Sequence, residues 1–125
     1  MNYLQGSQVL YEQVVRNRRY FHQHPEAGMN LPETCAYVMA RLIEVGYQPP
    51  QLGGGVTATV PGKPDGKMFL FRADMDALPI REEGVLSFAS QRGCAHDIAM
   101  LLGAEALIYG AAAYTSGAAM WLELH

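Results

Sequence analysis

Three short segments of the chain carry side chains that could bind a metal ion or move protons. They are residues 22–26 (HQHPE), residues 72–79 (RADMDALP) and residues 93–97 (GCAHD). In the third segment Cys94 and His96 are two positions apart, so an extended backbone can present a thiolate and an imidazole to one cation. Zinc accepts such sulfur and nitrogen ligands, and a zinc-bound water attacks carbonyl groups at neutral pH. The alternative is a small buried cysteine beside a histidine that bonds to the next aspartate.

Two carboxylates follow the second apolar run of the chain. If extended backbone continues past Ala73, the side chains of Asp74 and Asp76 project to the same side. Two neighbouring carboxylates are costly to ionise together, and a divalent cation or a shared proton relieves that cost. Ligands of open α/β sheets bind at the carboxyl ends of strands, which is where this pair is expected. The alternative is a solvated acidic loop.

His22, His24 and the other cysteine of the chain, Cys35, are predicted to have structural roles. His22 and His24 are expected at the end of a helix, where an imidazole interacts favourably with the helix dipole. Cys35 falls on the apolar stripe of the next helix and is predicted to be core. Because a reducing compartment is expected, Cys35 and Cys94 are predicted to be free thiols or metal ligands rather than a disulfide.

Two helices are expected before the sheet. Apolar residues at helical spacing predict an amphipathic helix over residues 7–21, which stops at His24 because a proline follows. A second helix is expected to begin at Asn30, with Glu33 as its capping partner, and to end at Gly46.

The rest of the chain predicts strands and a third helix. Residues 56–60 alternate apolar and hydroxyl side chains, which predicts a half-buried strand, and the apolar run 68–71 predicts a strand covered on both faces. A helix is expected over residues 97–109, whereas residues 121–124 suit either a strand or a disordered end. This order predicts an α/β fold, with part of an open, mostly parallel sheet and flanking helices.

The composition is that of one folded domain. The chain has 125 residues, 50% hydrophobic, with nine basic and twelve acidic residues and a net charge of −3. No basic stripe is available for phosphates, so nucleic acid is not expected as a partner. The apolar stretch 98–113 is interrupted by Glu105 and is shorter than the roughly 20 residues of a membrane span, so no membrane partner is expected. Residues 1–6 do not resemble a secretory signal, which predicts a cytoplasmic protein.

These segments together resemble a known family. Residues 18–26 (RRYFHQHPE) are similar to the opening R-x-x-H-x-H-P-E segment of metal-dependent amidohydrolases and carboxypeptidases, which include N-acyl-amino-acid, hippurate and auxin-conjugate hydrolases. Residues 71–80 (FRADMDALPI) match the family signature RADMDALPI. Residues 94–104 resemble its segment C-G-H-D…AMLLGAA. The resemblance covers approximately residues 8–108.

The resemblance implies a hydrolase that uses two divalent metal ions to cleave the amide bond of N-acyl amino acids or small peptides. Zinc, manganese, cobalt and nickel all remain open as the metal. Cys94 and His96 would be metal ligands, with the thiolate bridging the two ions, and Asp76 would orient an imidazole or the metal site from behind the ligands. Residues 1–125 are expected to be an incomplete N-terminal portion of a zinc-exopeptidase-like catalytic domain, without the family's Glu-Glu pair and its lid or dimerisation domain.

The segment around Cys94 departs from the family pattern. The family has G-x-M-H-A-C-G-H-D, whereas residues 92–97 read RGCAHD, which is shorter before the cysteine and has Ala95 in place of glycine. The alternative function is therefore a truncated, catalytically inactive relative that acts at most as an interaction module. Such a chain would self-associate through an uncovered strand edge.

Overall fold

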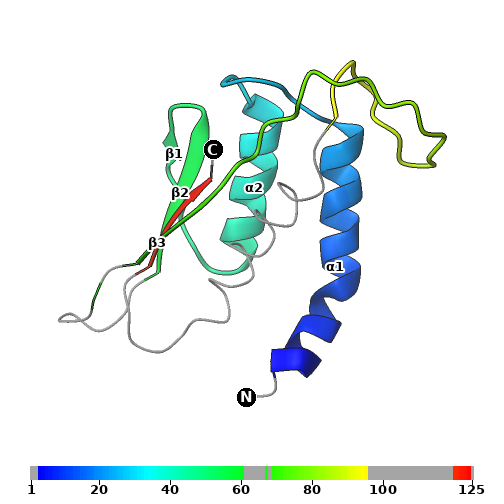
Figure 1. Cartoon of the computed structure of the whole chain (residues 1–125). Coiled ribbons are helices and arrows are strands. Elements are labelled where there is room, and N and C mark those ends of the chain that lie inside the picture. The colour runs from blue at the N-terminus through cyan, green and yellow to red at the C-terminus, as the bar shows by residue number, and fades with distance from the viewer. Residues whose placement is uncertain (1–2, 61–66, 68, 96–119, 125) are drawn as a thin grey trace.

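The structure is a computed structural model that describes residues 3–60, 67, 69–95 and 120–124. Its elements, in chain order, are α1 (Tyr3–Gln23), α2 (Pro32–Glu44), β1 (Gln51–Leu52), β2 (Gly55–Val60), β3 (Phe69–Ala73) and β4 (Met120–Leu124). Helix α2 lies between the sheet and α1 (Figure 1). The α/β class is confirmed. The helix expected over residues 97–109 lies outside the described residues.

The four described strands form a mixed sheet in the order β1-β2-β4-β3. Only β3 and β4 pair in parallel, whereas β1 with β2 and β2 with β4 are antiparallel. The expected mostly parallel character is therefore not found in these strands. A short hairpin turn imposes the antiparallel pairing of β1 and β2, and β4 runs parallel to β3 but opposite to β2. Residues 121–124, for which a strand and a disordered end were both open, lie in the strand between β2 and β3.

Both helices end close to the predicted positions. Helix α1 stops two residues before Pro25, and Gly46 follows α2 with a φ of 94°, in the left-handed region that glycine adopts readily. The predicted apolar arc of α1 is buried only toward its end: Phe21 is 2% exposed, but Tyr11 is 63% exposed. Helix α2 has 13 residues against 21 in α1, so it covers only part of the longer helix.

The predicted start of α2 is wrong in its capping residues. Leu31 occupies the capping position and no side chain of the helix's own start bonds to the free backbone N–H groups. Instead, the carboxylate of Glu26 accepts hydrogen bonds from the N–H groups of Glu33 and Thr34, at 3.3 and 2.7 Å. The predicted Asn30–Glu33 pair is therefore replaced by a carboxylate from the preceding loop, which the positive end of the helix dipole also favours.

The core lies between α2 and the sheet. Its buried apolar members are Phe21, Leu31, Cys35, Val38, Leu42, Val56, Ala58, Val60, Ala73 and Met75. Two burial predictions are corrected. In β2 every residue except Thr59 is buried, because β2 lies inside the sheet between β1 and β4. In β3, Leu70 is 64% exposed and Arg72 is also exposed, because β3 ends the order of the described strands.

None of the helices in the described part of the chain is long and apolar enough to cross a membrane.

Candidate functional site

The chain that follows β3 runs across the end of α1 and the beginning of α2 (Figure 1). Two backbone hydrogen bonds attach it there. The N–H of Ala77 donates to the carbonyl of Glu26 at 2.7 Å, and the N–H of Gln91 donates to the carbonyl of Gln23 at 3.1 Å. The last residue of α1 and the loop that follows it therefore hold this segment at two places 14 residues apart.

The segments that carry Asp76 and Cys94 are bonded to each other. Leu78 and Ala95 form an isolated antiparallel bridge, in which each N–H donates to the other residue's carbonyl at 2.9 and 3.0 Å. Asp76 lies two residues before Leu78, and Cys94 lies one residue before Ala95. The tertiary structure thus brings together two segments that are about 18 residues apart in sequence.

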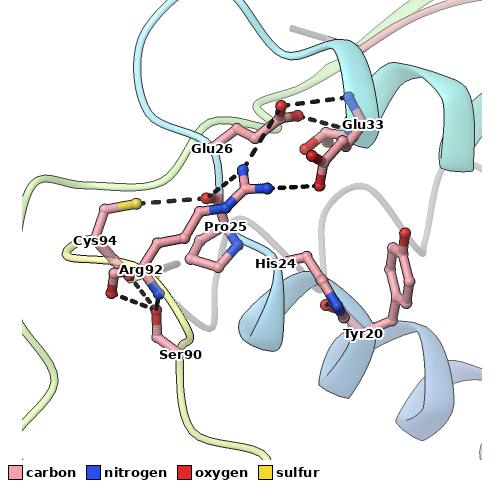
Figure 2. Close-up of polar contacts among 9 residues, drawn as sticks. Tyr20, His24, Pro25, Glu26, Glu33, Ser90, Arg92 and Cys94 are labelled. Atoms are coloured by element: carbon pink, nitrogen blue, oxygen red, sulfur yellow. Dashed lines mark hydrogen bonds and ion pairs between the residues drawn. The ribbon is translucent and has the colours of Figure 1, made fainter.

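Cys94 is a free, half-buried cysteine that faces the loop between the helices. Its thiol donates to the carbonyl of Pro25, with 3.5 Å between sulfur and oxygen (Figure 2). The hydroxyl oxygen of Ser90 lies 2.6 Å from the carbonyl oxygen of Cys94 and 2.9 Å from that of Arg92, so its single proton is shared between these two acceptors. The backbone around Cys94 is therefore closed into a turn by the hydroxyl group of Ser90.

Arg92 connects this turn to the loop between the helices and to the first turn of α2. Its Nη1 donates to the carbonyl of Pro25 at 3.3 Å, and its Nη2 donates to Oε2 of Glu33 at 2.6 Å (Figure 2). Oε1 of the buried Glu26 lies 3.8 Å from Nη1. The hydrogen bond to Glu33 is the main cause that raises the pKa of Arg92. No pattern in the sequence predicts a role for Arg92, because an arginine in an irregular loop follows no periodic spacing.

Each of the two histidines before Pro25 makes a polar contact within the described structure. Nε2 of His22 lies 3.0 Å from Oε1 of Glu82, and Oε2 of the same carboxylate accepts the N–H of Ser90 at 2.8 Å. These bonds, that of Ser90 first, lower the pKa of Glu82. Nδ1 of His24 lies 2.9 Å from the carbonyl of Tyr20, one helical turn earlier. The predicted structural role of the histidines agrees with these contacts, although the partner of His22 is a carboxylate on a distant loop.

Cys35 lies in the core, as predicted. Its side chain is 1% exposed, and its thiol donates to the carbonyl of Gly54, with 3.4 Å between sulfur and oxygen. Burial, followed by the negative charge of Glu26, raises the pKa of this thiol. Cys35 is therefore a protonated core residue and is not a candidate ligand.

The two carboxylates after β3 line one cavity of about 290 Å³. The other lining residues are Gly28, Met29, Leu31, Gly54 and Arg72. Asp74 and Asp76 therefore face the same space, as expected from their spacing. Oδ1 of Asp74 accepts a hydrogen bond from Nη2 of Arg72 at 3.0 Å, so this carboxylate is paired with a cation. Cys94 is not among the residues that line the cavity.

One of the two predicted metal ligands lies among the described residues. The half-buried thiol of Cys94 suits zinc and other divalent ions that bind sulfur. His96, the predicted second ligand, lies outside the described residues. Within the described ranges no group of three or more His, Cys, Asp or Glu side chains could hold a metal ion. The role of Cys94 as a ligand, like the rest of the coordination, therefore stays a prediction.

Comparison with known proteins finds similar enzymes but no matching family model. The chain is 40% identical, over 108 residues, to N-acetyl-L-cysteine deacetylase of Bacillus subtilis, an alignment that covers 79% of this chain and 26% of the relative. It is 38% identical, over 101 residues, to N-acyl-L-amino acid amidohydrolase of Geobacillus stearothermophilus, covering 72% of this chain and 27% of the relative.

A solved structure is similar to the fold described above. The crystal structure of the YXEP protein of Bacillus subtilis, described as a dinuclear metal binding peptidase from the M20 family, superposes with a TM-score of 0.84 and 28% sequence identity. The superposition covers 94% of this chain and 35% of that protein. The chain therefore spans between a quarter and about a third of the length of these proteins.

Proposed function

Because the chain belongs to the family of metal-dependent amidohydrolases and carboxypeptidases, which includes N-acyl-amino-acid amidohydrolases and M20 peptidases, we propose that it contributes to the hydrolysis of the amide bond of N-acyl amino acids. The observation that carries this proposal is the bridge between Leu78 and Ala95. It joins the segment of Asp76 to the segment of Cys94. A site formed by both segments requires that they lie next to each other.

The proposal assigns a role to each predicted site residue. Cys94, through its thiolate, and His96, through its imidazole, would hold the divalent metal. Asp76 orients an imidazole or the metal site from behind the ligands. The ions supply a Lewis acid that polarises the scissile carbonyl. The substrate is a small N-acyl amino acid or peptide, because the relatives are named for activity on such compounds.

The test of this proposal compares the two cysteines. The chain is incubated with ZnCl₂ or MnCl₂, and its metal content and its hydrolysis of N-acetyl amino acids are measured. We expect bound metal in the unmodified chain and in Cys35→Ala, whose substituted thiol lies in the core. Cys94→Ala is expected to lose metal and turnover, because a bound ion loses its sulfur ligand. Equal metal content in Cys94→Ala and the unmodified chain would contradict the role of Cys94.

The second function, an inactive chain that acts as an interaction module, makes a different prediction. It expects neither bound metal nor turnover in the unmodified chain, together with self-association. The exposed Leu70 on β3, the last strand in the described order, favours an association through this edge. Metal content and turnover therefore separate the two functions, because association through β3 is compatible with both.

A further inference from the structure

Arg92 joins the turn that carries Cys94 to parts of the chain that are far away in sequence. Its Nη1 bonds to the carbonyl of Pro25, 67 residues earlier, and its Nη2 bonds to the carboxylate of Glu33, 59 residues earlier. A guanidinium group is a planar fork that can bond to two acceptors at once, and its hydrogen bonds to carboxylates are stronger than those between neutral groups. Arg92 is therefore held in one position by a loop and by the first turn of α2.

Two shared hydrogen-bond partners, Ser90 and Pro25, connect Arg92 to Cys94 (Figure 2). The hydroxyl of Ser90 shares its one proton between the carbonyls of Arg92 and Cys94, so both carbonyls of this turn point toward the same side chain. The carbonyl of Pro25 accepts hydrogen bonds from both the guanidinium of Arg92 and the thiol of Cys94. The two side chains thus converge on one acceptor, and Arg92 restricts where the sulfur can lie.

We propose that Arg92 is a positioning residue for Cys94: by binding Pro25 and Glu33, it holds the turn of residues 90–94 in the place from which the sulfur of Cys94 serves as a ligand. The importance of this role for activity rests on the proposed function. The positioning itself is a property of the chain without metal or substrate, so it is tested separately.

The first test measures backbone amide hydrogen exchange in the metal-free chain. The N–H of Ala95, which donates to Leu78, reports on the backbone next to Cys94, and the N–H of Cys35, which donates to Leu31, reports on the core. In Arg92→Ala we expect exchange at Ala95 to increase about tenfold, because charge-assisted hydrogen bonds are lost, with no change at Cys35. An unchanged rate at Ala95 would overturn the proposal. So would an equal increase at both amides, since Arg92 would then stabilise the whole fold.

A second variant tests the hydrogen bond between Arg92 and Glu33. Glu33→Gln removes the charge of an exposed side chain on α2, and we expect exchange at Ala95 to increase about threefold, because one of the two anchors is weakened. In the Arg92→Ala background the same substitution is expected to have no further effect. Additive effects of the two substitutions would show that Glu33 acts independently of Arg92 and would contradict the proposal.

The control is another arginine of the same loop. Arg81 has no side-chain hydrogen bond or ion pair among the described residues, so Arg81→Ala is expected to leave exchange at Ala95 unchanged. An increase equal to that of Arg92→Ala would overturn the specific role of Arg92.

A spectroscopic measurement then separates this inference from the proposed function. Co²⁺ bound through sulfur gives a sulfur-to-cobalt charge-transfer band, which we expect in the unmodified chain and in Arg81→Ala, and weakened in Arg92→Ala. A band of equal strength in Arg92→Ala would contradict positioning of the ligand. The absence of any band in the unmodified chain would contradict the proposed function, whereas the exchange experiment would still decide whether Arg92 fixes the turn.

Discussion

Glu26 contacts three separate parts of the site region. Its carboxylate accepts the N–H groups of Glu33 and Thr34 at the start of α2, and its backbone carbonyl accepts the N–H of Ala77. Nη1 of Arg92 lies 3.8 Å from the same carboxylate. The side chain is only 8% exposed, so the loss of its carboxylate would leave the buried N–H of Thr34 and the part-buried N–H of Glu33 without this acceptor.

Glu26→Ala is therefore expected to lower the free energy of unfolding by about 2 kcal/mol, and Glu26→Gln by less, because the amide oxygen still accepts a hydrogen bond. Urea denaturation measures both changes. The matched control is Glu83→Ala, an exposed glutamate of the loop, which is expected to change the stability by less than about 0.5 kcal/mol. An equal loss in the two alanine variants would contradict a capping role for Glu26.

The lowered pKa of Glu82 predicts that the stability of the fold depends on pH. Hydrogen bonds from Ser90 and His22 lower its pKa below the ordinary value of 4.5. A lowered pKa in the folded state stabilises the fold above pH 4.5, and this contribution is lost as the pH falls through the lowered pKa. We expect Glu82→Gln to be less stable than the unmodified chain at neutral pH, with a difference that shrinks below pH 4.5 in urea titrations. A difference that is independent of pH, or an equal effect of Glu83→Gln, would argue against stabilisation of the Glu82 carboxylate by these hydrogen bonds.

At the scale of the elements, the hairpin of β1 and β2 is held close to the loop that precedes α2. A side-chain Cβ at Gly54 would lie 2.2 Å from the carbonyl oxygen of Met29. The carbonyl of Gly54 accepts the thiol of Cys35 on α2. The absence of a side chain at Gly54 thus allows the sheet, α2 and the loop to meet beside the cavity that Asp76 lines.

Gly54→Ala is expected to lower the free energy of unfolding by about 1–3 kcal/mol, because the backbone of Met29 must move to admit the methyl group. Thermal or urea denaturation measures the change. Gly84→Ala is the control, since no atom lies closer than 3.8 Å to a Cβ at that position. Comparable stabilities of the two variants would show that the close approach at Gly54 is relieved without cost.

At the scale of the whole molecule, the order of the strands determines which edges are exposed. Among the described strands β3 pairs only with β4, and its Leu70 is 64% exposed. The other end of the order is β1, which has two residues and offers few free backbone groups.

We expect the unmodified chain to self-associate as its concentration rises in sedimentation velocity, and Leu70→Lys to reduce this association, because a charge on an edge strand opposes further pairing. Leu52→Lys on β1 is the matched control: its leucine is 59% exposed, but the two-residue strand is too short to support pairing. A chain that stays monomeric, or equal effects of the two lysine variants, would contradict association through β3.

The features that the sequence alone determined are those that depend on neighbouring residues. The proline after His24 ends α1, Gly46 follows α2, and the spacing of Asp74 and Asp76 directs both carboxylates into one cavity. The RADMDALP and GCAHD segments also indicated the family, because a motif is a local pattern.

Tertiary structure alone decided the features that join distant segments. Residues 120–124 form an inner strand, and α2 is capped by Glu26 rather than by its own first residues. Tertiary structure likewise decided the exposure of Leu70 on β3 and the hydrogen bonds of Arg92 to Pro25 and Glu33. These contacts connect residues whose types carry no information about one another along the chain, so they exist only once hydrophobic burial has brought the segments together.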